Sequence, residues 1–263
     1  MDLQDLTFTV AEGIATITLN RPNEANALSL RMAQDLHTVA NHCDAERSIR
    51  AVILTATGKM FCSGGDVISF GKAGDGVNEL MRNMTTYLHG AIARFERMNA
   101  PLIVAANGTA AGAGLSIMLT GDIVLAAASA KFTMAYTGIG VSPDGSSSFY
   151  LPRIVGMLKA KEMMLMNPRY DAEQAKALGL VTEVVADDQL MPRAMEIARQ
   201  FAAGPTMAYG EVKRLLADTF SNGLETQMEL ETRAIAGLTK YTHDAREGIR
   251  AFGEKRKPQF KGE

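Results

Sequence analysis

Residues 101–114 read Pro-Leu-Ile-Val-Ala-Ala-Asn-Gly-Thr-Ala-Ala-Gly-Ala-Gly. The run 101–106 is apolar throughout, which is typical of a strand buried on both faces, and Asn107-Gly108 then favours a turn. The small residues that follow predict the start of a short helix, whose first amides lack acceptors and carry a partial positive charge. Those amides could stabilise a carbonyl oxygen that gains negative charge. Close packing of the helix on the sheet explains the small residues equally well.

A second segment repeats this arrangement earlier in the chain. Residues 50–56 (RAVILTA) form another apolar run, and the motif 61–66 (FCSGGD) follows it. Glycines let backbone amides come close to a ligand, and successive exposed N–H groups form an anion-binding concavity. Taken alone, this motif is more typical of an ordinary turn at the end of a strand.

The third informative segment carries an acid. Residues 138–148 (GIGVSPDGSSS) place Asp144 in a turn rich in proline and glycine, just before the start of a small-residue helix. An aspartate there could act as an acid or base, or it could simply hold a turn or cap the helix.

The rest of the chain predicts an α/β core followed by helices. We expect a hairpin at 6–10 and 14–19, a helix capped by Ser29 and ending near residue 45, a helix at 78–98, and a strand at 123–127. Residues 67–77, with three glycines, read as a mobile loop. Alternating strands and helices favour a largely parallel sheet. Later segments are helical at 146–155, 159–166, 172–178 and in four stretches between 187 and 253, with one strand at 181–185.

A break at Gly204-Pro205 predicts a core of residues 1–203 and a helical C-terminal region of residues 204–263. The chain has 263 residues, a formal net charge of −2 and only two cysteines. This balance disfavours a nucleic-acid partner, and the cysteines predict neither a disulfide scaffold nor a zinc site, so we expect no metal and a reducing, cytoplasmic location. Residues 1–5 lack a signal-peptide pattern. The uncharged stretch 98–121 is interrupted by proline, asparagine and glycines, so we expect no membrane span.

In this order and spacing, the segments resemble the enoyl-CoA hydratase/isomerase (crotonase) superfamily over nearly the whole chain. The matching segments are 19–22 with 26–28, 61–66, 101–114, 121–122, 151–153, 175–181 and 247–256. The resemblance implies a crotonase-like α/β spiral of strand–strand–helix units with a C-terminal helical trimerisation region. It also implies that an acyl-CoA thioester places its carbonyl oxygen between the amides of Gly65 and Ala113.

The resemblance further implies a binding site for coenzyme A, which is part of the substrate and not a separate cofactor. A homotrimer or homohexamer is expected, and an adjacent subunit would bring Lys255 to a phosphate with Phe252 nearby; a solvated helix lysine is the equal alternative. Helix 78–98 is expected to line the acyl pocket, whose acyl group the sequence does not identify. The remaining residues expected to contact substrate or coenzyme A are Ala25, Ala27, Ser63, Gly64, Asp66, Val67, Ile68, Tyr136 and His89.

Two positions separate this chain from the hydratases that it resembles. Hydratases deliver water with two glutamates, and this chain has Ser116 and Tyr136 at those positions. Asp144 instead matches the acidic residue of Δ3,Δ2-enoyl-CoA isomerases and of bacterial isomerases of phenylacetate degradation. The resemblance therefore predicts that Asp144 takes a proton from C2 of a 3-enoyl-CoA and returns it at C4.

Two alternatives stay open. Aromatic acyl-CoA dehalogenases of the superfamily use an aspartate at this position as a nucleophile, together with a tryptophan and a histidine base; Tyr136 and His89 hold the matching positions here. We interpret His89 as a residue that only lines the pocket or its wall. A non-catalytic acyl-CoA-binding homologue is the other alternative, although such a protein would not need Asp144.

Overall fold

The computed structural model describes residues 1–263 and contains two sheets. In the larger sheet, strands β1 and β2 form an antiparallel hairpin, and every later pairing is parallel. The predicted hairpin and parallel sheet are therefore confirmed. The strand order is β1 (Leu6–Ala11), β2 (Ile14–Leu19), β3 (Ala51–Ala56), β5 (Leu102–Ala106), β7 (Ile123–Ala127) and β10 (Glu183–Val185).

Both faces of this sheet are covered, which explains the apolar runs. Val52 and Leu54 of β3 belong to one core cluster, on the side of helices α1 (Leu30–Ala45) and α3 (Val77–Arg97). Ile53 belongs to the other cluster, which helix α8 (Leu190–Ala202) closes. Ser29 caps α1 as predicted, since its Oγ accepts a hydrogen bond from the Met32 amide at 2.9 Å.

The second sheet consists of short strands that the sequence analysis did not predict. Their order is β4 (Met60–Cys62), β6 (Thr109–Ala111), β8 (Lys131–Thr133) and β9 (Tyr170–Asp171). Segments of two or three residues are too short to show a period. β4, β6 and β8 each follow a strand of the large sheet and precede a helix, so the fold is a succession of strand–strand–helix units.

One expectation about the first half of the chain was wrong. Residues 67–77 are not a loop: they form helix α2 (Val67–Ala73) and a 3₁₀ turn at Gly74–Gly76 before α3 begins. Asp66 caps α2, because its Oδ1 accepts a hydrogen bond from the Ser69 amide at 3.1 Å. This cap outweighs the low helix propensity of Gly71. The other short helices are α4 (Ala113–Met118), α5 (Ser147–Val155), α6 (Met157–Met166) and α7 (Ala172–Ala177).

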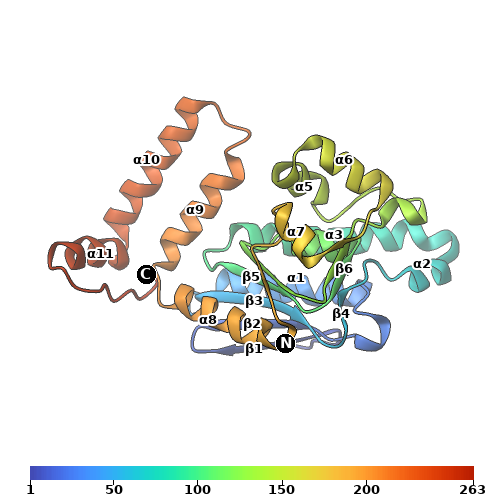
Figure 1. Cartoon of the computed structure of the whole chain (residues 1–263). Coiled ribbons are helices and arrows are strands. Elements are labelled where there is room, and N and C mark those ends of the chain that lie inside the picture. The colour runs from blue at the N-terminus through green and yellow to red at the C-terminus, as the bar shows by residue number, and fades with distance from the viewer.

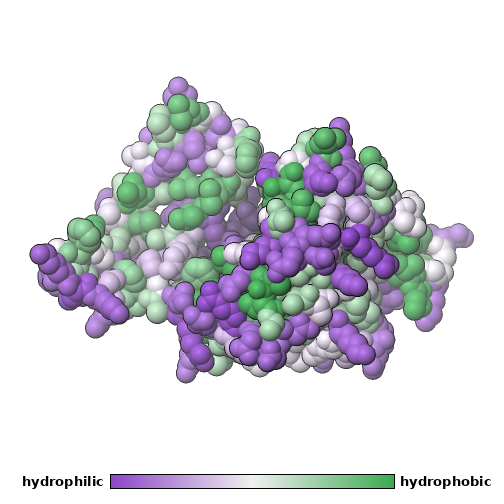
Figure 2. Space-filling model, in the orientation of Figure 1, coloured by the Kyte–Doolittle hydropathy of each residue, from purple (hydrophilic) through white to green (hydrophobic).

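The last three helices project from the core as an arm (Figure 1). They are α9 (Thr206–Asp218), α10 (Leu224–Tyr241) and α11 (His243–Gly253), and the sequence break at Gly204-Pro205 lies between α8 and α9. α10 has no buried residue, and Figure 2 shows apolar surface on this arm. None of the helices combines the length and the apolar character needed to cross a membrane.

Candidate active site

A cavity of about 270 Å³ joins the three segments that the sequence analysis singled out. Gly65, Ala113 and Asp144 all line it, and we call it the Asp144 cavity. Its other walls are mostly apolar and come largely from α3, as predicted for helix 78–98, and from the segment after β8. The apolar lining includes Phe70, Met81, Met84, Leu88, Ile139 and Val141.

Two backbone amides in the wall of the cavity have no partner in the protein. Leu28 and Gly65 pair through two hydrogen bonds: the Leu28 amide donates to Gly64 O at 2.7 Å, and the Asp66 amide donates to Leu28 O at 3.0 Å. Neither bond uses the Gly65 amide. Ala113 is the first residue of α4, where an amide has no acceptor within the helix. Neither amide donates to another group of the chain, so both are free to bind an oxygen in the cavity.

Glycines bring these two amides to the same place. A Cβ on Gly64 would lie 3.1 Å from Ala111 O and 3.6 Å from the Ala113 amide nitrogen. A Cβ on Gly114 would lie 2.3 Å from Cys62 O, far inside contact distance. The two loops therefore pack backbone against backbone, which larger residues at these positions would prevent. The donor expected at position 113 is a backbone amide, which alanine has as well as glycine.

Asp144 presents one carboxylate oxygen to the protein and leaves the other free. Oδ1 lies 2.7 Å from His89 Nε2, and Oδ2 has no hydrogen-bond partner in the chain. The side chain of Asp144 is 33% exposed. It does not cap the helix that follows, because α5 begins at Ser147 after Ser146, and no backbone amide donates to the carboxylate. The helix-cap alternative for Asp144 is therefore wrong, whereas its backbone does form a turn, because the Ser147 amide donates to Asp144 O at 3.3 Å.

His89 is the site residue whose position the sequence analysis misjudged. It lies on α3, and it does not simply line the cavity wall: its imidazole contacts the carboxylate of Asp144 directly. About half of its side chain is exposed, and it is not among the residues that line the cavity. The two residues are 55 positions apart, and nothing in the local sequence of either one signals the contact.

Asp144 is the only acidic residue that lines the cavity. At the two positions where hydratases have glutamates, the Tyr136 hydroxyl and Ser116 Oγ lie 2.8 Å apart and are buried. Burial raises the pKa of the Tyr136 phenol well above its usual value, so this group stays protonated at neutral pH. The wall therefore offers two amide donors and a single carboxylate.

Comparison with known proteins places this site in a family. The family model described as Enoyl-CoA hydratase/isomerase matches residues 9–263. This chain belongs to the enoyl-CoA hydratase/isomerase family. This match confirms the resemblance to the crotonase superfamily. The family acts on acyl-CoA thioesters.

Similar proteins include members with different activities. The chain is 36% identical over 254 residues to 1,2-epoxyphenylacetyl-CoA isomerase of Escherichia coli K12, covering 96% of this chain and 97% of that protein. It is 34% identical over 236 residues to 4-chlorobenzoyl coenzyme A dehalogenase-2 of Arthrobacter sp, covering 89% and 85%. The crystal structure of an enoyl-CoA hydratase/isomerase from Mycobacterium abscessus superposes with a TM-score of 0.92 at 34% identity, covering 98% and 100% of the two chains. The expected crotonase-like fold is confirmed.

In this family member, segments 25–28 and 63–66, which are expected to contact coenzyme A, lie side by side. The Ser63 amide donates to Ala25 O at 3.1 Å, which brings segment 25–28 beside segment 63–66. Val67 and Ile68 are exposed on α2. The Asp66 side chain has a structural use: burial opposes its charge, but hydrogen bonds from Ser69 and Arg21 outweigh burial and lower its pKa. Contact of these segments with coenzyme A stays a prediction.

Phe252 and Lys255 lie far from the other candidate residues. Phe252 is near the end of α11, Lys255 follows that helix, and Figure 1 shows α11 and α2 at opposite ends of the molecule. The ring of Phe252 is almost fully exposed. Within one chain these residues do not reach the Asp144 cavity, so their predicted role depends on an adjacent subunit and is untested.

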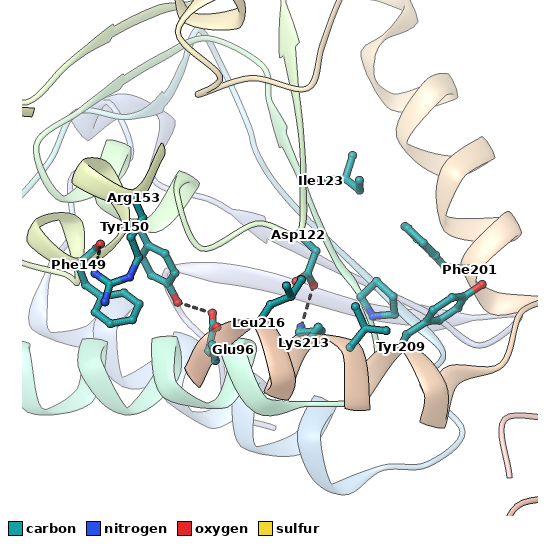
Figure 3. Close-up of a pocket in the computed structure, with 13 residues that line it drawn as sticks. Glu96, Asp122, Ile123, Phe149, Tyr150, Arg153, Phe201, Tyr209, Lys213 and Leu216 are labelled. Carbon is teal, nitrogen blue, oxygen red and sulfur yellow. Dashed lines mark hydrogen bonds and ion pairs between the residues drawn. The ribbon is translucent and has the colours of Figure 1, made fainter. Parts of the chain in front are cut away.

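A second cavity, of about 370 Å³, lies between the core and α9 (Figure 3). Its polar groups bind one another: Lys213 Nζ is 2.8 Å from Asp122 Oδ2 and also donates to Phe95 O, and the Tyr150 hydroxyl donates to Glu96. The hydrogen bonds and the ion pair of Lys213 hold α9 on the core. Asp122 and Glu96 each keep one carboxylate oxygen without a partner, so what sets the Asp144 cavity apart is its two unpaired backbone amides.

Proposed function

We propose that the protein is an acyl-CoA isomerase that converts a 3-enoyl-CoA into a 2-enoyl-CoA. One observation carries the proposal: a single carboxylate, Asp144, shares a cavity with the unpaired amides of Gly65 and Ala113. Double-bond migration needs one group that removes a proton and gives it back, and a site that holds the charge in between. It needs no second carboxylate to activate water.

The reaction follows from these positions. The thioester oxygen accepts hydrogen bonds from the two amides, and Asp144 Oδ2 takes a proton from C2. The electron pair moves into a dienolate whose negative charge lies on the thioester oxygen. The protonated carboxyl then returns the proton at C4, so the C3–C4 double bond becomes a C2–C3 double bond. A positioned acid or base typically contributes about 10²- to 10⁴-fold, and each oxyanion donor about 10²- to 10³-fold.

The groups at the hydratase positions support an isomerase over a hydratase. Ser116 and the phenol of Tyr136 cannot serve as carboxylate bases, and the raised pKa of Tyr136 keeps it protonated. The Escherichia coli relative named as an isomerase also supports isomerisation of an acyl-CoA thioester by a chain of this kind.

A second candidate function is favoured by a separate observation, the contact between His89 Nε2 and Asp144 Oδ1. In an aromatic acyl-CoA dehalogenase, the aspartate would attack the ring carbon that bears the halogen and form a C–O bond while halide leaves. Water activated by the histidine would then hydrolyse the aryl ester and restore the carboxylate. The Arthrobacter relative named as a dehalogenase supports this candidate. Tyr136 stands where that chemistry is expected to use a tryptophan.

The test compares three thioesters: a 3-enoyl-CoA, a 2-enoyl-CoA and 4-chlorobenzoyl-CoA. We expect conversion of the first alone, followed by the absorbance of the conjugated product. Asp144→Asn should lower kcat by about 10²- to 10⁴-fold and leave the affinity for a saturated acyl-CoA unchanged. Asp218→Asn, an exposed aspartate of α9, is the matched control.

Each other result decides against the proposal. Undiminished isomerisation by Asp144→Asn would remove Asp144 from the mechanism. Release of chloride from 4-chlorobenzoyl-CoA without isomerisation would establish the second candidate. Tight binding of all three thioesters with no turnover would identify a non-catalytic acyl-CoA-binding protein.

A further inference from the structure

Ser116 and Tyr136 form a hydrogen-bonded link beside the Asp144 cavity, which Tyr136 lines and Ser116 does not. Both are buried, Ser116 completely. Ser116 Oγ lies 3.3 Å from Gly112 O and 2.8 Å from the Tyr136 hydroxyl, and that hydroxyl lies 3.1 Å from Asp144 O. The link therefore begins at the residue before the Ala113 donor and ends at the backbone of the residue that carries the free carboxylate.

Two hydroxyl protons serve these three contacts. Either Ser116 donates to Tyr136 and Tyr136 donates to Asp144 O, or Tyr136 donates to Ser116 and Ser116 donates to Gly112 O. In both arrangements each of these two buried hydroxyls has a hydrogen-bond partner within the chain. Unpaired buried hydroxyls are costly, so the two loops are held at a fixed separation.

The turn that carries Asp144 needs such a constraint. Gly145 and Ser146 both have positive φ angles, of 61° and 64°, and a non-glycine residue in this region is strained. A Cβ on Gly145 would lie 3.0 Å from Ser116 Cβ, so Ser116 also packs directly against the turn. The Asp144 carbonyl accepts from Ser147 Oγ at 2.9 Å in addition to the Tyr136 hydroxyl.

We propose that Tyr136 and Ser116 are positioning residues, which set the distance between the carboxylate of Asp144 and the oxyanion donor of Ala113. This inference rests on the proposed isomerase function. The two side chains do not touch the reacting atoms in the proposal. They act through the backbone of Asp144 and of Gly112, and they occupy the positions from which hydratases of the resembled superfamily deliver water.

The contrasting interpretation is that Tyr136 only fills the wall of the cavity. Its ring does line the cavity, so loss of the whole side chain would not distinguish the two. Tyr136→Phe keeps the ring and removes the hydroxyl, and Ser116→Ala breaks the same link at its other member. Tyr150→Phe is the matched control, because it removes a hydroxyl that also bonds to a protein group, Glu96, but lies at the second cavity.

The experiment measures kcat and KM for the 3-enoyl-CoA with these variants and with the double variant Tyr136→Phe/Ser116→Ala. A misplaced base typically costs up to about 10²-fold, so we expect kcat to fall about 10- to 10²-fold in each single variant, with KM within about twofold. Because both hydroxyls belong to one link, the double variant should be no worse than the poorer single variant. Tyr150→Phe should keep the wild-type kcat.

Hydrogen exchange gives a readout that does not depend on turnover. The amides of Ser142 and of residues 144–148 should exchange faster in Tyr136→Phe and Ser116→Ala than in wild type or in Tyr150→Phe. A kcat equal to that of Tyr150→Phe, a rise in KM alone, or unchanged exchange would overturn the inference. The proposed function would still stand after any of those results, provided that Asp144→Asn is inactive. If the wild type does not convert the 3-enoyl-CoA, the proposed function is rejected, and the hydrogen-exchange rates alone then test the positioning role of Tyr136 and Ser116.

Discussion

The wall of the Asp144 cavity and the C-terminal arm differ in how far the chain itself completes them. In the wall, loops 61–66 and 111–114 pack backbone against backbone, and buried hydroxyls have partners within the chain. In the arm, α10 has no buried residue, and large apolar side chains such as Leu216, Phe220 and Ile235 are exposed. The difference teaches that a single chain brings Gly65, Ala113 and Asp144 into one cavity, whereas its arm leaves apolar side chains uncovered.

The same substitution should have opposite consequences in the two regions. Gly114→Ala puts a Cβ 2.3 Å from Cys62 O and must separate loop 61–66 from loop 111–114. We expect kcat/KM to fall at least about 10²-fold and the free energy of unfolding to fall by about 1–3 kcal/mol. Gly237→Ala in α10 meets no atom within 4 Å, and alanine should raise helix stability by about 0.5–1 kcal/mol.

Steady-state kinetics and urea unfolding check this pair. Wild-type kcat/KM in folded Gly114→Ala would show that the close approach of the two loops is not needed for catalysis.

The junction between the two regions gives the next largest effect. Lys213 of α9 is buried against Asp122, so Lys213→Met leaves a carboxylate without its cation. Breaking a buried pair by removing one partner costs about 3–5 kcal/mol, and we expect the lower end because the Asp122 side chain is 27% exposed. The midpoint of urea unfolding should fall, while kcat of the folded enzyme stays within about twofold of wild type.

Arg233→Met removes an exposed partner of Glu229 within α10 and is the control. Its unfolding midpoint should equal that of wild type, because exposed pairs contribute little. Equal midpoints for Lys213→Met and wild type would mean that the Asp122–Lys213 pair does not hold the arm to the core.

How much the sequence could predict depends on the range of the interactions. The strands β3, β5 and β7 were predictable because each is buried on both faces, and the three glycine-rich or acidic segments after them do meet in one cavity. Local signals failed where elements were two or three residues long, as in the second sheet. They also failed at α2, where the cap by Asp66 was overlooked.

Contacts between distant residues were beyond the sequence. The partners His89 and Asp144 are 55 residues apart, and Ser116 and Tyr136 are 20 apart. Which pairs meet is decided by the packing of α3 and α4 against the turn before α5. The roles of Lys255 and Phe252 are still predictions, since one chain does not bring them to the cavity.

His89, the more exposed partner of Asp144, distinguishes the isomerase from the dehalogenase. In the proposed isomerase it contacts Oδ1, away from the free oxygen that moves the proton, so His89→Gln should lower isomerase kcat by no more than about 10-fold. In a dehalogenase it would be the base that activates water, and its loss would cost about 10²- to 10⁴-fold. Thr85→Ser, on the same helix and also lining the cavity, controls for disturbance of that wall.

The smallest effect on chemistry is expected in the arm. Ile235 of α10 is 67% exposed and lines a groove with Val212 and Leu215 of α9. If this apolar groove is buried in the predicted trimer or hexamer, Ile235→Glu should reduce the mass measured by light scattering to that of one chain. Glu225→Gln, also exposed on α10, should leave the mass unchanged.

Kinetics of the dissociated Ile235→Glu protein then test whether Lys255 and Phe252 contact the substrate of an adjacent subunit. Asp144, Gly65 and Ala113 come from one chain, so kcat at saturating substrate should stay within about twofold. KM for the coenzyme A ester should rise, because Lys255 and Phe252 would no longer reach the substrate of an adjacent subunit. A dissociated protein with the wild-type KM would exclude both residues from the coenzyme A site, since α11 and α2 lie at opposite ends of a single chain (Figure 1).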